Sequence, residues 1–335
     1  MTDSILSLIS RFTGLSIAVI GDVILDEYLI GRANRLSREA PVPVLEFEER
    51  RVIAGGAANP AANIVALGGA AEMIGVVGAD AEALTLRQVL DKKGITWRGL
   101  IEDRTRPTTV KTRIMAQMGL RFPQQVARID RVARDPIAGD VETRVYEAIS
   151  QAAGVSACLF SDYGSGLITE GVIAHARQLA STNGVLLTAD AQAHLSKYTG
   201  FGVVKCNADD AAAAVGHGLH SDSEFATAAE TLRDRLQLTR GMVITRGGAG
   251  STIAETNGTV THVAAPRVVD VFDTVGAGDT HIAILTLALA VGGTLTQAVT
   301  LANAGSSIVV RHVGNYAPSQ AELKQSLTAE GEEKP

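Results

Sequence analysis

The sequence contains few cysteines and no long apolar run, and both shortages exclude classes of protein. Only two of its 335 residues are cysteines, Cys158 and Cys206, and they lie far apart in apolar segments. This excludes a disulfide framework and favours a reducing compartment. The longest apolar stretch, residues 282–291, is too short to span a bilayer. The first residues include an early aspartate and lack the basic start of a signal peptide, so we expect a cytoplasmic protein without a membrane partner.

Positive charge and aromatic side chains are also scarce. The formal net charge is −6, and no stripe of lysine and arginine is present, which argues against a nucleic-acid partner. Aromatic residues make up only 4% of the chain, whereas 46% is hydrophobic and 34 residues are glycine. This composition is typical of a turn-rich α/β enzyme.

Strand-like apolar segments alternate with helix-like segments along most of the chain. Residues 15–25 form a β-branched apolar run that predicts a buried strand, and residues 277–312 predict two apolar helices. Residues 27–54 and 97–131 interrupt this rhythm with polar, alternating segments. The sequence therefore predicts one domain over residues 1–335, with a doubly wound, mostly parallel sheet flanked by helices. The two interrupting segments would form a small β-strand lid.

The two common glycine-rich phosphate motifs are missing. No GxxxxGK[ST] loop and no GxGxxG after a strand is present. Instead, "DTVGAGD" places Gly276, Ala277 and Gly278 directly before Asp279 at the start of an apolar helix. Free amides at a helix start bind anions, and a carboxylate beside them could take a proton from an attacking hydroxyl group. Phosphoryl transfer needs this combination, although an ordinary helix start with a first-turn aspartate fits the same pattern.

Two further segments place candidate ligands after predicted strands. Thr245, Gly247 and Gly250 follow an apolar strand, where ligands bind in open α/β sheets; a tight hairpin turn is the alternative. Asn207 and Asp210 have the i, i+3 spacing of one helix face and suit a hydrated Mg²⁺ ion. An N-cap asparagine followed by a helix-start acid explains that second pair equally well.

Polar residues near the N-terminus suggest a site for a polyol. Asp22 and Asp26 follow the first predicted strand, where carboxylates could hold sugar hydroxyl groups. Gly55 and Gly56 would let the backbone approach such a ligand, and Asn59 can both donate and accept. Turn formation is the alternative role for all of these residues.

These motifs, in this order, resemble those of the ribokinase-like, pfkB-type carbohydrate kinases. The N-terminal phrase "GGAANPAANIVALG" and the C-terminal phrase "DTVGAGD" carry the resemblance over nearly the whole chain. The phrases "SREAPVPV" and "QQVARID" are more closely similar to the bacterial D-glycero-β-D-manno-heptose 7-phosphate kinases, including the kinase half of the bifunctional heptose enzymes. This chain ends without a segment that resembles the other half, so we expect a kinase alone.

The resemblance implies an ATP- and Mg²⁺-dependent sugar kinase and a role for each matching residue. Asp279 matches the catalytic base and residues 276–278 the anion hole, while Asn207 and Asp210 match a magnesium and phosphate motif. The implied nucleotide contacts are Thr245, Gly247, Gly250 and Asn303, and the implied sugar contacts are Asp26, Gly55, Gly56 and Asn59. The lid pairs subunits in relatives, which implies a homodimer, and some relatives hold a monovalent cation such as K⁺ near Asp273.

Two positions depart from the pattern of the heptose kinases. Ser165 and Gln192 stand where those kinases have lysines, while Lys111, Arg113 and Arg128 remain as basic side chains for a sugar phosphate. The alternatives are a kinase for an unphosphorylated sugar or a nucleoside, and a non-catalytic sugar-binding protein. The charged, aromatic-poor lid argues against a nucleoside, and the presence of Asp279 argues against a protein without catalysis.

Overall fold

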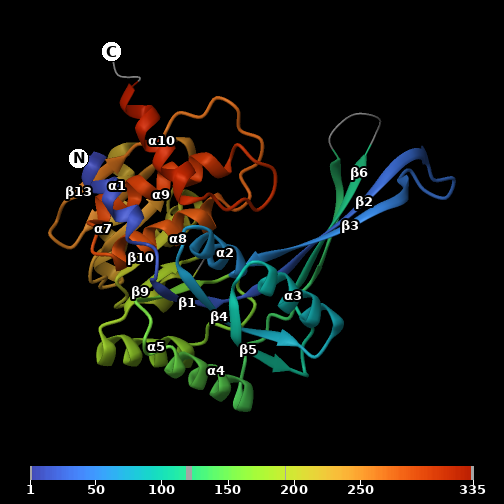
Figure 1. Cartoon of the computed structure of the whole chain (residues 1–335), viewed down its shortest axis with the longest axis horizontal. Helices are drawn as coiled ribbons and strands as arrows, with labels where there is room; N and C mark the ends of the chain where they lie inside the picture. The colour runs from blue at the N-terminus through green and yellow to red at the C-terminus, as the bar shows by residue number, and fades with distance from the viewer. Residues whose placement is uncertain (1, 118–122, 193, 333–335) are drawn as a thin grey trace.

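The β-branched apolar segments form one nine-stranded sheet in the computed structural model, which describes residues 2–117, 123–192 and 194–332 (Figure 1). The strand order is β13-β12-β11-β10-β9-β8-β1-β4-β5. Neighbouring strands run parallel except that β12 is antiparallel to β11 and β13. This confirms the predicted mostly parallel sheet. The strands are β1 (Ser16–Gly21), β4 (Ala70–Gly78), β5 (Thr96–Asp103), β8 (Ala157–Ser161), β9 (Leu186–Asp190), β10 (Val203–Asn207), β11 (Gly241–Thr245), β12 (Ser251–Glu255) and β13 (Val260–Val263).

Helices cover both faces of this sheet. One apolar core joins a sheet face to α1 (Thr2–Ser10), α2 (Ala58–Ala66), α3 (Ala81–Lys92), α8 (Ala277–Ala290), α9 (Leu295–Val309) and α10 (Gln320–Glu332). A second core joins the other face to α4 (Gly139–Gln151), α5 (Glu170–Asn183), α6 (Ala208–Val215) and α7 (Asp222–Arg235). Two short 3₁₀ helices, η1 (Leu195–Tyr198) and η2 (Gly247–Ala249), complete the described helices. Among the described residues, no helix is long and apolar enough to cross a membrane.

Helix α8 is central to the first layer because its sequence is apolar on all sides. Every residue from Asp279 to Leu289 is buried. A helix without a polar face must be enclosed, and α8 packs against both α2 and α9. Its first turn is therefore held firmly against the edge of the sheet where the strands end.

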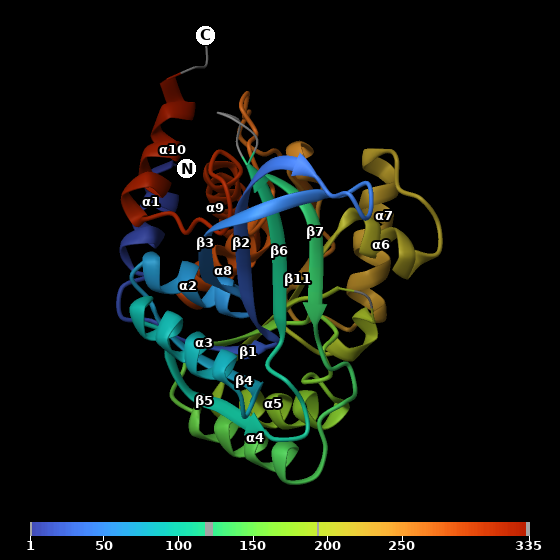
Figure 2. The same cartoon turned by 90° about the vertical axis from the view of Figure 1, so that its right-hand side faces the viewer.

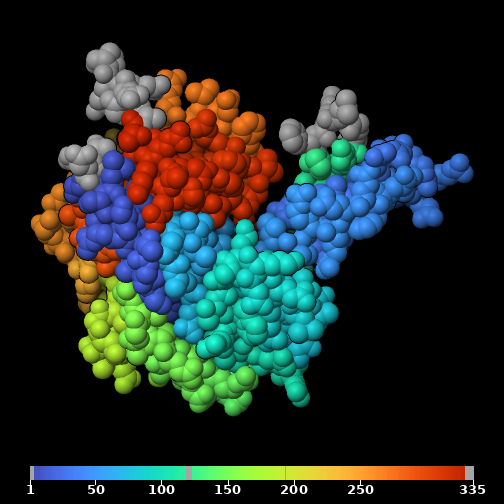
Figure 3. Space-filling model, in the orientation of Figure 1, coloured from blue at the N-terminus to red at the C-terminus, as the bar shows by residue number. Residues whose placement is uncertain are grey.

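A second, four-stranded sheet projects from the body of the molecule (Figures 1 and 3). It contains β2 (Val23–Leu36), β3 (Pro43–Gly56), β6 (Val110–Gln117) and β7 (Gln124–Arg131). Figure 2 shows the strands in the order β3-β2-β6-β7. Strand β2 starts two residues after β1 ends, so the projecting sheet begins beside the carboxyl ends of the main sheet.

The second interrupting segment differs from its predicted boundary. Residues 97–103 belong to β5, which pairs in parallel with β4 at the edge of the main sheet. A parallel edge strand can carry polar residues on its outer face, which made this segment look like part of the projecting sheet. Only the later part of residues 97–131, β6 and β7, contributes to that sheet.

Candidate active site

The carboxyl ends of five parallel strands meet along one edge of the main sheet. Each strand ends at, or is followed by, a polar side chain, as expected for a binding edge of an open α/β sheet. These residues, taken from β1, β8, β9, β10 and β11, are Asp22, Asp162, Asp190, Asn207 and Thr245. The first turn of α8 lies at the same edge, and a cavity of about 510 Å³ opens between this turn and the ends of β9, β10 and β11. The side chains facing this cavity include Asp190, Lys205, Asn207, Asp209 and Asp279.

Asp279 is the buried carboxylate of this cavity. Asn59 Nδ2 donates to its Oδ2 at 2.7 Å, and the hydroxyl group of Tyr163 donates to its Oδ1 at 2.9 Å. Asn59 comes from α2 and Tyr163 from the loop after β8, so three separate elements fix the carboxyl group. The sequence motif alone located Asp279 and Asn59 but gave no sign that they touch.

Burial changes the acidity of Asp279. Loss of water around the carboxylate raises the pKa of Asp279 to about 6, despite the opposing hydrogen bonds from Asn59 and Tyr163. Burial, together with the nearby Asp279 charge, raises the pKa of Tyr163 well above its ordinary value, so its hydroxyl group stays protonated as a donor. A carboxylate with a pKa near neutrality can accept a proton and release it again.

The start of α8 is shaped by Gly276. This residue precedes the helix with φ = 82°, a left-handed conformation that favours glycine. A Cβ atom on Gly276 would lie 2.8 Å from Asn59 Nδ2. The amide N–H of Ala277 donates a hydrogen bond to Thr274 O at 3.3 Å. The amides of Gly278 and Asp279 have no acceptor within the part of the chain that the structure describes, so they are available to an anion.

A buried ion pair that sequence reasoning missed lies beside this turn. Lys205 Nζ donates to both carboxylate oxygens of Asp190, at 2.9 and 2.8 Å. The two residues are partners in the register of β10 and β9. A lysine within the apolar strand segment "GVVKCN" was the available signal, because lysine is rarely buried without a partner.

A second cavity of about 370 Å³ continues from the first around the start of α8. Thr245, Gly247 and Gly278 line both cavities. Gly250 and Asn303, two of the predicted nucleotide contacts, also line the second cavity. The structure therefore brings all four predicted nucleotide contacts together in one cavity that adjoins Asp279.

Two of these nucleotide candidates also shape the cavity wall. A Cβ atom on Gly250 would lie 2.1 Å from Val263 O, so only glycine lets the turn after β11 pass so close. Asn303 Nδ2 donates to Val263 O at 3.0 Å, while Asn303 Oδ1 accepts from Ser251 Oγ at 2.8 Å. The amide of Asn303 is thus occupied by contacts that hold the wall in place.

The predicted magnesium pair lies at the start of α6. Asn207 caps this helix, because its Oδ1 accepts the amide N–H of Asp210 at 2.8 Å. Asn207 therefore acts as the N-cap that the alternative interpretation predicted. It also lines the cavity beside Asp190 and Lys205. The neighbouring Asp209, which the sequence motif did not single out, also lines the cavity.

The predicted sugar residues separate into two groups. Asp26 and Asn59 lie near Tyr163 and Asp279, and a Cβ atom on Gly55 would lie 2.1 Å from Asp26 Oδ2. Asp22 instead uses its Oδ2 to accept the amides of Tyr163 and Ser165 at 2.9 and 3.0 Å. Asp22 therefore shapes the loop that carries Tyr163, and it does not line the Asp279 cavity.

Gly56 belongs with Asp22. It has φ = 55°, and a Cβ atom there would lie 2.3 Å from Asp22 O. The turn between β3 and α2 therefore requires glycine at this position for close backbone contact.

The three predicted basic residues lie on one face of the projecting sheet. Lys111 Nζ lies 5.2 Å from the centroid of the Tyr163 ring, which places it beside the cavity. Arg113 forms an ion pair with Asp26, and Arg128 lies opposite Arg113 in β7, where it pairs with Asp130 at 2.9 Å. Lys111 is thus the cation beside the cavity, and Arg113 and Arg128 lie side by side two residues farther along the sheet.

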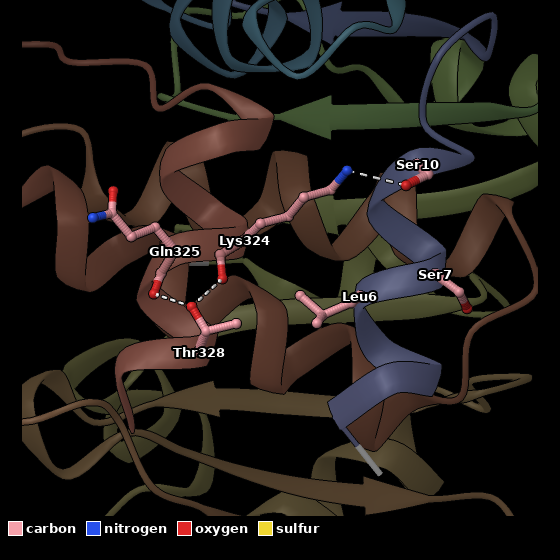
Figure 4. A pocket seen from close by; sticks show the side chains of 6 residues that line it. All are labelled: Leu6, Ser7, Ser10, Lys324, Gln325 and Thr328. Atoms are coloured by element: carbon pink, nitrogen blue, oxygen red, sulfur yellow. Dashed lines mark hydrogen bonds between the residues drawn. The ribbon is translucent and has the colours of Figure 1, made fainter. Parts of the chain in front are cut away.

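A groove elsewhere on the surface has a different character. It lies between α1 and α10 and is lined by Leu6, Ser7, Ser10, Lys324, Gln325 and Thr328 (Figure 4). Lys324 Nζ donates to Ser10 Oγ at 3.1 Å across it. None of the residues from the five strand ends lines this groove, so the candidate active site is the pair of cavities around α8.

Comparisons with known proteins bear on the family and the fold of the chain. The family model described as pfkB family carbohydrate kinase matches residues 15–322. The chain is 35% identical to the bifunctional protein HldE of Caulobacter vibrioides over 334 residues, covering 99% of this chain and 68% of that protein. It is 37% identical to HldE of Geobacter metallireducens over 323 residues, covering 96% of this chain and 64% of that protein. The chain thus spans about two thirds of the length of these relatives.

Solved structures share the fold at low sequence identity. Arabidopsis thaliana ribokinase, complexed with ribose and ATP, has a TM-score of 0.72 and 16% identity, covering 94% of this chain and 99% of that one. Escherichia coli phosphofructokinase-2, in complex with substrates and products, has a TM-score of 0.75 and 19% identity, covering 95% and 99%. The predicted ribokinase-like fold is therefore confirmed.

Proposed function

The chain belongs to the pfkB family of carbohydrate kinases, and on that premise we propose that it transfers the γ-phosphoryl group of ATP to a hydroxyl group of a heptose 7-phosphate or a similar sugar phosphate. The observation that carries the proposal is Asp279, a buried carboxylate with a pKa of about 6 beside two free helix-start amides. The similarity of the chain to the HldE proteins, over almost the whole length of the chain, favours a heptose substrate.

In the proposed reaction, Asp279 acts as the general base. The sugar hydroxyl oxygen forms a new bond to the γ-phosphorus of ATP while the bond from that phosphorus to the β-phosphate oxygen breaks, and ADP leaves with that electron pair. Asp279 takes the hydroxyl proton. Asn59 and Tyr163 hold the carboxylate in place through their hydrogen bonds. The amides of Gly278 and Asp279 stabilise the negative charge on the phosphoryl oxygens.

We assign ATP to the second cavity, with its phosphates extending into the first. Thr245 and Gly247 line both cavities and would lie along the phosphates. Asn303 and Gly250 shape the far wall, where the base would lie.

The residues at the start of α6 fit a hydrated Mg²⁺ ion that is held largely by phosphates. Within the described residues, no group of three His, Cys, Asp or Glu side chains is placed to hold a metal ion, so an all-protein site is absent there. A Mg²⁺ ion bound with ATP needs only one or two protein carboxylates. Asp209 and Asp210 would supply them beside Asn207. When bound, the ion would neutralise charge on the phosphates.

The sugar would lie between Asp279 and the projecting sheet. Asp26 and Asn59 offer hydrogen-bond partners to its hydroxyl groups, and Gly55 leaves room for the Asp26 carboxylate. Lys111, Arg113 and Arg128 supply positive charge for a phosphate on the sugar, which compensates for the missing lysines at positions 165 and 192. The projecting sheet would act as a lid that excludes water from the reaction.

A panel of acceptors tests the substrate, with ATP consumption as the readout. We expect turnover with heptose 7-phosphate and little turnover with unphosphorylated sugars or nucleosides. Asp279→Asn should lower kcat by about 10²–10⁴-fold while leaving ATP affinity intact, because only the proton acceptor is lost. Activity confined to unphosphorylated sugars would contradict the heptose phosphate proposal, and near-normal turnover of Asp279→Asn would contradict the assigned base.

We further propose that K⁺ binds near Asp273, in the loop before α8. The Asp273 carboxylate accepts the amides of Val275 and Gly314 at 3.0 and 2.9 Å, which ties this loop to the segment after α9. Escherichia coli phosphofructokinase-2, which shares the fold, has been solved in complex with potassium. Replacing tetramethylammonium chloride with KCl at constant ionic strength should raise kcat several-fold. Equal rates in the two salts would contradict a cation site.

We also propose a homodimer formed through the projecting sheet. Leu29, Phe47, Ile114 and Ile129 lie on the face opposite Asp26 and Arg113, as the strand register requires. Phe47 and Ile129 are 69% and 59% exposed. The Glu27–Arg50 ion pair lies on the same face. An exposed, partly apolar sheet face is typical of an interface, and a second copy of the chain can present the same face to it.

A further inference from the structure

Lys205 lies at the boundary between the apolar core and the Asp279 cavity. It is the third of the five residues of β10 and only 4% exposed. Its side chain lines the cavity together with Asp279 and Gly278. A lysine in this position is a fixed positive charge at the place where the phosphates of the nucleotide are expected to lie.

Among the residues that the structure describes, only two of the three donors of the Lys205 ammonium group have close partners. Two N–H groups bond to the oxygens of Asp190 at 2.9 and 2.8 Å. The third has Gly278 O at 3.5 Å, which is at the outer limit of a hydrogen bond. The ammonium group also lies close to the α8 turn itself, because a Cβ atom on Gly278 would be 3.0 Å from Nζ. The incompletely used donor therefore lies beside the free amides of Gly278 and Asp279.

Stability alone gives little reason for this ion pair. Removing two charges from water costs about as much as their attraction returns, so apolar residues of similar volume would serve a structural role as well. A buried cation held by a carboxylate is, however, well suited to stabilise charge that develops beside it in a water-poor cavity. Asp190 then holds the Lys205 ammonium group directed towards the turn.

We propose that Lys205 is a further catalytic residue, whose ammonium group binds an oxygen of the γ-phosphoryl group as it passes from ATP to the acceptor hydroxyl. Lys205 approaches the phosphoryl group from β10 while the amides of Gly278 and Asp279 approach it from α8. Asp190 is its positioning residue. This inference rests on the proposed kinase activity, but it also predicts a difference between ATP and ADP binding that needs no sugar.

The main test variant removes both charges of the ion pair together, so that it leaves no uncompensated charge buried. Lys205→Gln alone would leave the Asp190 carboxylate without its partner and could prevent folding. The double variant Asp190→Asn with Lys205→Gln replaces both charges by amides that can bond to each other. Asp190→Asn alone keeps the lysine and serves as the matched control. Circular dichroism and thermal unfolding establish that each variant is folded.

Isothermal titration calorimetry with ATP and with ADP gives the readout independent of sugar. We expect the double variant to bind ATP about tenfold more weakly, with ADP affinity unchanged, because only ATP carries the γ-phosphoryl group. We expect Asp190→Asn alone to retain most of the preference for ATP. Equal weakening for both nucleotides, or unchanged affinity for both, would overturn the proposal.

Turnover provides the second readout, with the acceptor that proves most active in the panel. The double variant should lose about 10²–10³-fold in kcat, as expected for one lost donor to a transferring group, with little change in KM for the sugar. A kcat within threefold of the wild type would show that Lys205 is only a counter-ion. Absence of turnover in the wild type with every acceptor would instead contradict the proposed function. The ATP and ADP titrations would still test whether Lys205 binds the γ-phosphoryl group.

Discussion

The pKa of Asp279 results from opposing effects of groups on three separate elements. Burial raises the pKa of this carboxyl group, while the donors on Asn59 and Tyr163 lower it. The resulting pKa of about 6 lies between the pKa of an ordinary exposed aspartate and that of a buried acid that stays protonated. A base of this strength is mostly ionised at neutral pH yet still able to hold a proton during transfer.

This balance predicts the pH dependence of the reaction. Asp279 must be ionised to accept a proton, so kcat/KM for the sugar should fall about tenfold per pH unit below an apparent pKa of about 6. Tyr163→Phe removes a hydrogen bond to the charged form, which is worth about 1.5 kcal/mol, and should move this limb about one pH unit upward. Rates measured from pH 4.5 to 8.5 will show the shift.

Tyr146→Phe is the matched control for that measurement. Tyr146 lies on α4, where its ring stacks on His175, away from the cavity. It should leave the acidic limb in place. If Tyr163→Phe has the same acidic limb as the wild type, the contact between Tyr163 and Asp279 does not govern the base.

At the scale of single elements, the start of α8 depends on the glycine before it. Gly276→Ala and Gly292→Ala both place a Cβ atom on a residue with positive φ, at opposite ends of this helix. Each should cost about 1 kcal/mol of stability from backbone strain. The Cβ atom of the Gly276 variant would lie 2.8 Å from Asn59 Nδ2, whereas no described residue has an atom within 4 Å of a Cβ atom at Gly292.

The two variants should therefore differ in activity more than in stability. Displacing Asn59 disturbs the hydrogen bond to Asp279, and a small misplacement of a catalytic group costs about tenfold to a hundredfold in rate. We expect that loss in kcat for Gly276→Ala and near-normal kcat for Gly292→Ala, with thermal unfolding measured for both. Equal rates in the two variants would argue that Asn59 does not position the base.

The sequence predicted these elements well where local pattern determines them. The apolar helix after "DTVGAGD" and the parallel strands follow from periodicity, and the structure contains both. Asp279 and the small residues before it were predicted because helix-start chemistry is local. Tyr163 and the Asp190–Lys205 pair were missed because their roles arise only when β8, β9, β10 and α8 meet.

At the scale of the whole molecule, the candidate site lies between two differently built parts. The main sheet and α8 supply the proposed base, the free amides and the ion pair, all fixed by buried packing. The projecting sheet supplies Lys111, Arg113 and Arg128 from strands with much less packing around them, and β7 is exposed along its length. Periodicity predicted such a sheet but not its limits, because the edge strand β5 is also partly polar.

A sheet this exposed should gain stability from a partner, and a second copy of the chain is the partner we propose. Ile129→Lys places a charge within the apolar face of Leu29, Phe47 and Ile114, where it would have to be buried on association. Leu84→Lys is the matched control, because Leu84 is also 59% exposed but lies on α3.

Sedimentation over a range of concentrations should show a dimer for the wild type and Leu84→Lys. For Ile129→Lys we expect at least a tenfold weaker dimer, since a buried charge costs more than about 1.4 kcal/mol. If the lid is steadied by its partner, this variant should also have a higher KM for the sugar at low protein concentration, with an unchanged affinity for ADP. A wild type that sediments as a monomer at every concentration would exclude the dimer and leave the lid to be ordered by substrate alone.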